Sequence, residues 1–481
     1  MNVVVITLDQ FRGDHLGVGG HPLARTPGLD ELAAHGVRFA RHHAQASPCA
    51  PGRASLYTGT YQMNHRVVAN GSPLDDRFDN LARLARRAGY DPTLFGYTDQ
   101  AVDPTTVEDP ADPRLHTYEG VLPGFTVGLD LTGAQAPWRE WLAAQGHDPG
   151  SGAGHALRTE PDRPAELGIS AYLTDRFLEW SARLDEPWFA HLSYLRPHPP
   201  YAAAGRWSTA FSPDEVDLPI PPPPDHDRLA LHRTMLDLFF TAAPTDEREL
   251  RHMRAQYLGM IADVDAQLQR IWAALRARGQ WDDTAVVVTA DHGDQLGDQG
   301  LVEKFGWFGA SYHVPCVVRD PSRPVAHGTV VDHFTENVDL LPTVADLLGV
   351  EVPRQCDGRP LTPFLDATTP DDWRDAAHWE FDWRFLAMLS GRTSGWPSDR
   401  RLERRNLAVR RTADRAYVQF ADGEAVVYDL AADPTWRTCT TDAGVALADA
   451  RALLAWRAEH TDRTHTGTLI GPFGDAGDAS D

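Results

Sequence analysis

Residues 3–10 read VVVITLDQ, a short and nearly continuous apolar run that ends in an acidic and an amide side chain. A run of this length without polar alternation is typical of a strand that is covered on both faces in a parallel sheet. Asp9 and Gln10 would then lie at the carboxyl end of this strand. The stretch therefore predicts a buried first strand with polar groups at its end.

Two further runs repeat this pattern, at 187–194 (PWFAHLSY) and at 284–290 (TAVVVTA). Each is followed by polar residues: His198 after the first, and Asp291 with His292 after the second. Because the carboxyl ends of parallel strands meet along one crevice, chemistry is expected there.

Helical patterns separate these runs. The expected helices span 27–36, 77–89, 165–184 and 245–278, with Thr245 as the N-cap of the last. Strands that alternate with helices predict an α/β fold with a large mixed, mostly parallel sheet that is flanked by helices.

The pattern changes after a helix expected at 337–348. Short strands separated by turn residues follow at 406–412, 415–420 and 424–430, which predicts an antiparallel sheet. We expect a catalytic domain over 1–370 and a smaller α+β domain over 371–481, with a helix at 443–459 and a disordered tail, GDAGDASD. The proline-rich stretch 219–227 is expected to be a surface excursion.

Composition narrows the choice of partner. The 481 residues carry 45 basic and 68 acidic side chains, a formal charge of −23, which disfavours nucleic acid and anionic membranes as partners. No apolar run approaches the roughly 20 residues of a membrane span. The N-terminus lacks the features of a signal peptide. Four widely separated cysteines form no CxxC pair, which favours reduced thiols and a cytoplasmic protein.

Residues 47–59 read SPCAPGRASLYTG and contain Cys49, Pro51 and Arg53 in a CxPxR arrangement. This resembles the signature of the sulfatases, a branch of the alkaline phosphatase superfamily. The resemblance implies that a separate formylglycine-generating enzyme oxidises Cys49 to formylglycine, whose hydrate is the nucleophile. The alternative is a buried cysteine before a helix.

The same resemblance implies a metal site. Asp9 and Gln10 match the position of the family's first metal segment, and Asp291 and His292, in TADHGDQLGDQG, match its second; Cys49 completes the set. A site with mostly oxygen ligands and one imidazole suits one divalent ion. We expect Mn²⁺, Mg²⁺ or Ca²⁺, and this set of ligands does not exclude Zn²⁺. Alternatively, each Asp caps a helix and the His makes a local hydrogen bond.

Basic side chains would meet the negative charge of the transition state. The resemblance implies that Arg53 steadies the nucleophile, that Lys304 contacts the substrate oxyanion and that His198 lies near the leaving group. A solvated lysine and a loop histidine are the alternatives. The spacing of Asp294 and Asp298 does not match that of a calcium-binding EF-hand loop. We expect these residues either to contact the metal ligands without binding the ion or to lie at the protein surface.

Several segments, including YQMNHRVVANGSPLDDR (61–77) and GYDPTLFGYT (89–98), look closer to phosphonate monoester hydrolases. That likeness implies Asn70 and Tyr97 as substrate contacts, although Tyr97 also fits a buried aromatic with a local partner. Asp99 departs from the threonines of that group. We expect it either to turn away or to meet a cationic part of the substrate.

The expected function is hydrolysis of a small anionic ester, a phosphonate monoester or phosphodiester. The alternatives are hydrolysis of sulfate monoesters, a non-catalytic member that keeps the fold, and a phosphomutase or phosphatase with a Ser or Thr nucleophile. Related hydrolases are often homo-oligomers, so a homo-oligomer is expected by analogy.

Overall fold

The computed structural model describes residues 1–117, 119–383, 406–461, 468–471 and 474–478. At its centre is an eight-stranded sheet of order β4-β3-β5-β1-β6-β7-β2-β8. The strands are β1 (Asn2–Leu8), β2 (Val37–His43), β3 (Thr93–Gly96), β4 (Thr126–Asp130), β5 (Phe189–Tyr194), β6 (Thr284–Thr289), β7 (Cys316–Arg319) and β8 (Thr329–Glu336). Strand β7 is antiparallel to β6 and β2, and the other paired strands are parallel. The predicted mixed, mostly parallel sheet is confirmed.

Strand β1 is central because both of its faces are buried. Val3 and Val5 belong to one hydrophobic core, whereas Val4 and Ile6 belong to the other. Pairing with β5 on one side and β6 on the other satisfies its backbone. The apolar run of the sequence therefore forms the middle of the sheet, with Asp9 directly after it.

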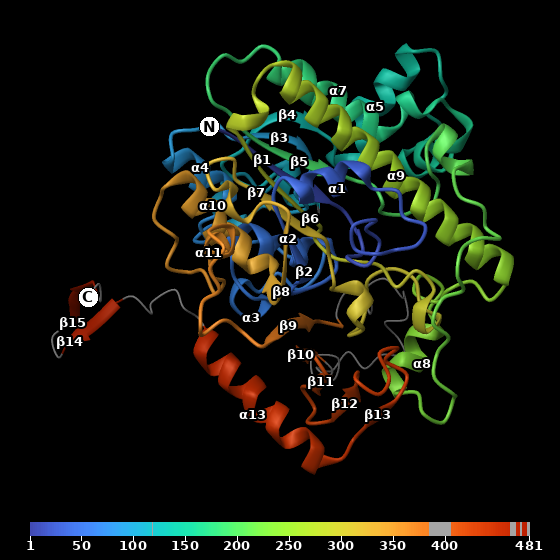
Figure 1. Cartoon of the computed structure of the whole chain (residues 1–481), viewed down its shortest axis with the longest axis vertical. Helices are drawn as coiled ribbons and strands as arrows, with labels where there is room; N and C mark the ends of the chain where they lie inside the picture. Colours follow the sequence, from blue (N-terminus) through green and yellow to red (C-terminus); the bar gives the residue numbers. More distant parts are fainter. Residues whose placement is uncertain (118, 384–405, 462–467, 472–473, 479–481) are drawn as a thin grey trace.

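Helices cover both faces of this sheet (Figure 1). On one face lie α1 (Pro27–Ala34), α7 (Ile169–Ser181) and α9 (Glu247–Ala277), and on the other α2 (Cys49–Thr58), α4 (Leu81–Arg87) and α10 (Leu340–Leu348). The described residues also form the helices α3 (Gln62–His65), α5 (Thr132–Ala144), α6 (Ala153–Arg158), α8 (Ala230–Leu236), α11 (Thr362–Leu365) and α13 (Ala443–His460).

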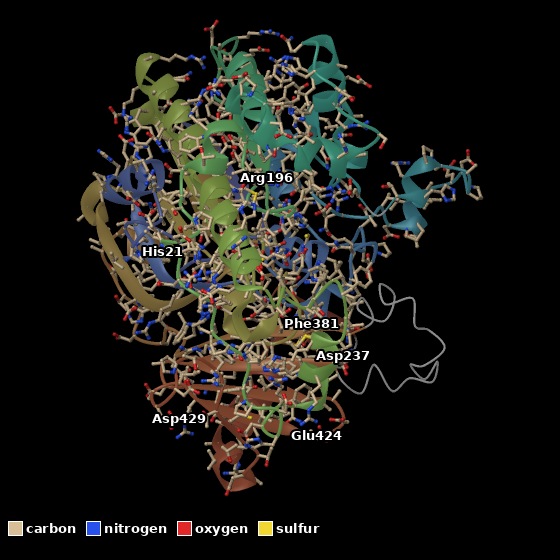
Figure 2. All side chains as sticks on the ribbon, turned by 90° about the vertical axis from the view of Figure 1, so that its right-hand side faces the viewer. His21, Arg196, Asp237, Phe381, Glu424 and Asp429 are labelled. Atoms are coloured by element: carbon tan, nitrogen blue, oxygen red, sulfur yellow. The ribbon has the colours of Figure 1, made fainter. Side chains whose placement is uncertain are left out.

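A second, antiparallel sheet of order β13-β12-β11-β10-β9 follows, as predicted, and Figure 2 shows it beneath the large sheet. Its strands are β9 (Ala376–Phe381), β10 (Leu407–Thr412), β11 (Arg415–Phe420), β12 (Ala425–Asp429) and β13 (Cys439–Thr440), and α13 packs on it. The domain boundary near residue 370 stays a prediction.

Part of the tail that was expected to be disordered forms a strand. Gly474–Asp478 forms strand β15, which pairs with β14 (Thr468–Gly471) in a hairpin that lies apart from the rest (Figure 1). Antiparallel pairing satisfies backbone groups of these two short segments. Residues 479–481 lie outside the described part of the chain.

Aromatic side chains join the small sheet to the large one. The ring of Tyr312 stacks on Trp379 of β9 at 4.8 Å between centroids. The indole of Trp307 donates a hydrogen bond of 2.9 Å to the Tyr428 hydroxyl on β12. Both Trp307 and Tyr312 belong to the segment that follows Lys304, so the small sheet supports that segment.

Helix ends differ from expectation by a few residues. The N-cap of α9 is Asp246 and not Thr245, because the Asp246 carboxylate accepts from the Glu249 N–H at 3.0 Å. The helix expected at 77–89 is shorter, because Asn80 caps α4 by accepting from the N–H groups of Ala82 and Arg83.

Two other expected helices begin with a separate turn. Residues 165–184 contain a 3-10 turn, Ala165–Leu167, and α7 starts after Gly168. Residues 337–348 likewise contain a 3-10 turn before α10. The proline-rich stretch 219–227 has no helix or strand. None of the helices in the described ranges is both long and apolar enough to cross a bilayer.

Helix α2 touches the loop after β6 backbone to backbone at Gly52. A Cβ atom at this position would lie 2.6 Å from the Asp291 carbonyl oxygen and 2.9 Å from that of Ala46. Both neighbours are backbone atoms, which cannot rotate away. Glycine therefore allows the N-terminus of α2 to approach Asp291 this closely.

We expect Gly52→Ala to lower the free energy of unfolding by about 1–3 kcal/mol, because the added methyl group must push α2 away from the loop. Urea denaturation measures this change. Gly152→Ala is the matched control, since a Cβ atom there meets nothing within 4 Å. Equal stabilities of Gly52→Ala and the unaltered protein would refute the close approach.

Candidate active site

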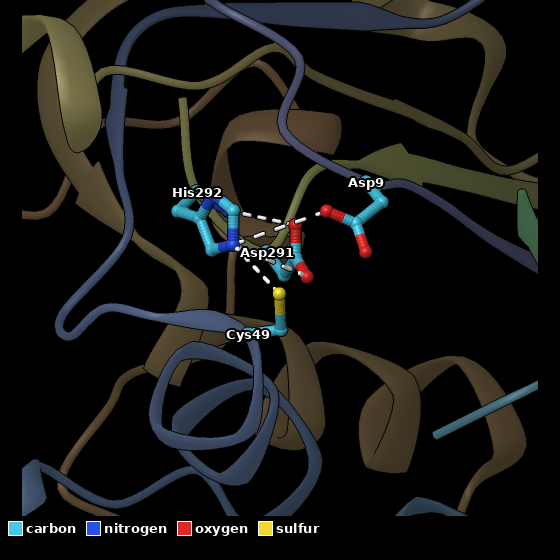
Figure 3. Close-up of side chains that lie close together, drawn as sticks. All are labelled: Asp9, Cys49, Asp291 and His292. Carbon is cyan, nitrogen blue, oxygen red and sulfur yellow. Dashed lines mark hydrogen bonds and ion pairs between the residues drawn. The ribbon is translucent and has the colours of Figure 1, made fainter. Parts of the chain in front are cut away.

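The candidate site lies where the carboxyl ends of β1 and β6 meet the N-terminus of α2. Asp9 follows β1, Asp291 and His292 follow β6, and Cys49 is the first residue of α2. Figure 3 shows the four side chains turned toward one another. The topology explains the meeting, because β1 and β6 are adjacent and parallel.

These four side chains form a compact, fully buried cluster. One ligand atom from each lies within 4.8 Å of all the others. His292 Nε2 is 3.3 Å from Cys49 Sγ and 3.9 Å from Asp9 Oδ1. The spacing leaves room for one ion among the four groups.

The orientation of the donor atoms fits a cation. His292 Nδ1 is 3.1 Å from the Gly293 carbonyl oxygen and donates to it, so the neutral ring turns the lone pair of Nε2 into the cluster. Burial, with the charge of Lys304, lowers the pKa of His292 to about 3, which keeps the ring neutral. Asp9 Oδ1 is buried without a hydrogen-bond partner. An unpaired carboxylate oxygen and an unprotonated imidazole nitrogen are suitable donors for a divalent ion.

Arg53 holds the two carboxylates in place from behind. Its Nε donates to Asp291 Oδ2 at 2.8 Å, and Nη2 donates to Asp9 Oδ2 at 3.1 Å. Nη1 donates to Ser193 Oγ at 2.7 Å. The structure thus uses Arg53 to orient carboxylates, and its predicted action on the nucleophile stays a prediction.

Cys49 sits at a helix N-terminus, where backbone N–H groups favour negative charge. Burial, with the charges of Asp9 and Asp291, nevertheless raises the pKa of its thiol well above the usual value. The unmodified side chain is therefore a poor thiolate. Asn70 accepts from the Ala50 N–H at 3.0 Å and so holds the start of α2.

Lys304, His198 and Gln10 form a second group beside the cluster. Lys304 Nζ donates to Gln10 Oε1 at 2.8 Å and to His198 Nε2 at 2.9 Å. His198 Nδ1 is 2.7 Å from the Pro199 carbonyl oxygen, and burial, with the charge of Lys304, lowers the pKa of His198. A charged lysine and a neutral histidine are thus paired. Gln10 has its side-chain oxygen on Lys304, so its predicted role as a metal ligand would require this contact to change.

Tyr97 and Asp99 lie on the Arg53 side of the cluster. The Tyr97 hydroxyl donates to Asp9 Oδ2 at 2.5 Å, so this tyrosine has a local partner and positions a carboxylate. Asp99 Oδ2 is 3.7 Å from Arg53 Nε, and its side chain is 8% exposed. Asp99 therefore faces the site and does not turn away. Burial raises its pKa to about 7, although Arg53 opposes the shift.

One acidic residue near the site, Glu303, was not predicted from the sequence. Glu303 Oε2 is 3.3 Å from both Lys304 Nζ and Gln10 Nε2, and only its position next to Lys304 signalled a role. Asp294 lies behind Gln10, with 2.6 Å between Asp294 Oδ2 and Gln10 Nε2. Asp298 is buried and ion-paired with Arg12 at 2.7 Å, so a surface position for it is excluded.

Comparison with known proteins extends this picture. Residues 1–350 match the family model described as Sulfatase. The chain is 36% identical to the multifunctional alkaline phosphatase superfamily protein PehA of Trinickia caryophylli, over 98% of each chain. It is 27% identical to a choline-sulfatase of Rhizobium meliloti, over 76% of this chain and 71% of that one.

The chain is also similar to a solved structure. The phosphonate monoester hydrolase of Agrobacterium radiobacter superposes with a TM-score of 0.87 over 99% of each chain, at 40% sequence identity. The chain is therefore a member of the sulfatase family and a hydrolase that acts on ester bonds.

Proposed function

We propose that this hydrolase cleaves phosphonate monoesters or phosphodiesters at one divalent ion, with formylglycine made from Cys49 as its nucleophile. The observation that carries the proposal is the position of Cys49 Sγ inside the cluster of Asp9, Asp291 and His292. The preference for phosphorus esters rests on the likeness to the phosphonate monoester hydrolase of Agrobacterium radiobacter.

Asp9, Asp291, His292 and the modified Cys49 would hold the ion, and Gln10 would join them if it left Lys304. The donor set suits Mn²⁺, Mg²⁺ or Ca²⁺, and Zn²⁺ remains compatible. When bound, the ion would act as a Lewis acid toward the ester and the nucleophile. Elemental analysis that finds no divalent ion bound to the purified chain would contradict this assignment.

Formylglycine would supply two oxygens as its hydrate, one to attack the ester and one to release the product. A separate formylglycine-generating enzyme would have to make it. The raised pKa of the Cys49 thiol supports this reading, because an unmodified thiol at this position stays protonated and is a weak nucleophile.

Proton transfer would fall to Lys304 and His198. Lys304 already donates to His198 Nε2, so the pair shares a proton at a defined atom. Its ammonium group would bind the substrate oxyanion and then pass a proton to the leaving oxygen, either directly or through His198. Asn70, which borders the N-terminus of α2, would offer its amide Nδ2 to the same oxyanion.

The cytoplasmic location and a homo-oligomeric state also remain predictions. A non-catalytic role is disfavoured, because the cluster of Asp9, Cys49, Asp291 and His292 is complete. A phosphatase of the serine or threonine type is disfavoured as well, since Cys49 occupies the nucleophile position.

The modification of Cys49 can be measured directly. We expect the peptide that contains Cys49 to lose about 18 mass units when the thiol becomes an aldehyde. We also expect Cys49→Ala to abolish turnover and Cys49→Ser to trap the covalent ester after one turnover. Full activity of Cys49→Ala would disprove the nucleophile.

Substrate class is tested by comparing phenyl phenylphosphonate with an aryl sulfate on fully modified protein. We expect the larger kcat/KM for the phosphonate. A large preference for the sulfate would reverse the order and make sulfate monoester hydrolysis the function, as the family model and the choline-sulfatase relative would then suggest.

Asp99 is proposed to meet a cationic group on the substrate, because it is a carboxylate that faces the site beside Arg53. The named substrate of the choline-sulfatase relative carries such a group. We expect Asp99→Thr to lower kcat/KM for a 2-aminoethyl phosphonate ester about tenfold relative to the neutral ethyl ester. Asp109→Thr removes a carboxylate from an exposed loop and should leave the ratio unchanged. An unchanged ratio in Asp99→Thr would eliminate the idea.

A further inference from the structure

A cavity of about 330 Å³ lies at the junction of the two sheets, away from the candidate active site. Neither Asp9, Cys49, Asp291 nor His292 lines it. On one side its walls include Ala40, Arg41 and His43 on β2 with Gln295 and Gln299, and on the other Arg411 on β10 with Trp436. Its size falls within the range of small-molecule sites.

One cation in the walls, Arg411, makes no direct ion pair with the residues that the structure describes. Arg411 is half-buried, its Nη1 is buried without a hydrogen-bond partner, and it has no ion pair within the described ranges. Burial, together with the charge of Arg41, lowers the pKa of Arg411 to about 10, although the charge of Asp414 opposes the shift. A buried and unpaired guanidinium is costly unless an anion joins it.

The acidic groups in the walls cannot neutralise Arg411. Asp14 is occupied by Arg12 at 2.7 Å and by His15 at 2.6 Å. Asp298 is occupied by Arg12 at 2.7 Å. Among the described residues no carboxylate makes an ion pair with Arg411, so an anion in the cavity would give it a direct partner.

Besides Arg411, the cavity walls contain hydrogen-bond acceptors that have no donor partner among the described residues. Oε1 of Gln295 and Oε1 of Gln299 are both buried without a hydrogen-bond partner. His43 Nδ1 is 3.1 Å from the Arg41 carbonyl oxygen and donates to it, which leaves Nε2 of the neutral ring as an acceptor. Hydroxyl groups on a ligand would satisfy these atoms.

Aromatic faces complete the walls. Trp436 and Phe334 line the cavity, and Trp436 has a positive φ of 59°. A bulky residue in this conformation persists only where its surroundings fix it, and such residues gather at ligand clamps. Gln299 helps to fix it, because its Nε2 donates to the Thr435 carbonyl oxygen at 2.5 Å across the junction.

We propose that this cavity is a second ligand site, which binds a small polyhydroxylated anion of the sugar-acid class. The carboxylate pairs with Arg411, the hydroxyl groups donate to Gln295 and Gln299, and the carbon skeleton packs on Trp436. Such a ligand joins the two sheets and stabilises their junction.

The test is isothermal titration of the full-length chain with D-gluconate, with uncharged D-glucose as the comparison. We expect gluconate to bind one site per chain and to raise the melting temperature, and glucose to bind at least about tenfold more weakly because it lacks the charge. Arg411→Met should weaken gluconate binding about tenfold or more, and Arg411→Lys should keep most of it.

Arg415→Met is the matched control, since it removes an arginine from the neighbouring strand β11 that does not line the cavity. Melting of each variant without ligand shows whether it is folded. The proposal is overturned if gluconate does not bind the unaltered protein, or if Arg411→Met binds it as tightly. It is also overturned if Arg411→Met changes the molar mass in solution while gluconate does not bind, because the cavity would then be a contact between copies.

Discussion

The guanidinium of Arg53 is the interaction on which the site depends. It is fully buried and joins Asp9, at the end of β1, to Asp291, at the end of β6. Two carboxylates this close repel each other unless a cation lies between or beside them. Arg53 supplies that cation from the interior and leaves Asp9 Oδ1 without a partner, whereas Asp291 Oδ1 accepts from the N–H groups of Gln10 and His292. Arg53 belongs to α2, so its two ion pairs connect the helix that carries Cys49 to the ends of β1 and β6.

The small sheet contributes to the site without supplying a residue to the cluster. Its aromatic residues support the segment 301–312, in which Trp307 and Tyr312 pack on β9 and β12. Ser47, two residues before Cys49, donates to the Lys304 carbonyl oxygen at 2.7 Å. The position of Lys304 relative to Cys49 is thus set by packing against the small sheet, and the second cavity lies in this same junction.

The fold could be predicted because the sequence patterns that indicate its strands and helices are local. The run at 3–8 is typical of a strand buried on both faces, and the short strands after 400 alternate with turn residues. Asp9 and Asp291 could be placed together because they follow strands whose ends a parallel sheet brings together, whereas Cys49 was added to them by the resemblance of its segment to sulfatases. Their roles remain predictions.

Partners that depend on side-chain direction could not be predicted. Tyr97 reaches Asp9, and Gln10 turns to Lys304, because loops set these orientations and no spacing in the sequence encodes them. The alternation of β10 places Arg410 and Arg411 on opposite faces, but only the structure shows that Arg410 pairs with Asp449 whereas Arg411 enters a cavity.

The charges around the cluster explain why an acidic chain can act on an anionic ester. Five carboxyl groups, those of Asp9, Asp99, Asp291, Asp294 and Glu303, surround two permanent cations, Arg53 and Lys304. Left alone, this set would repel a substrate anion. Burial offsets part of the excess by raising the pKa of Asp99 to about 7 and that of Asp294 to about 6, so each can hold a proton near neutral pH. A divalent ion held by Asp9 and Asp291, as proposed, would add two positive charges and would so favour the binding of a substrate anion.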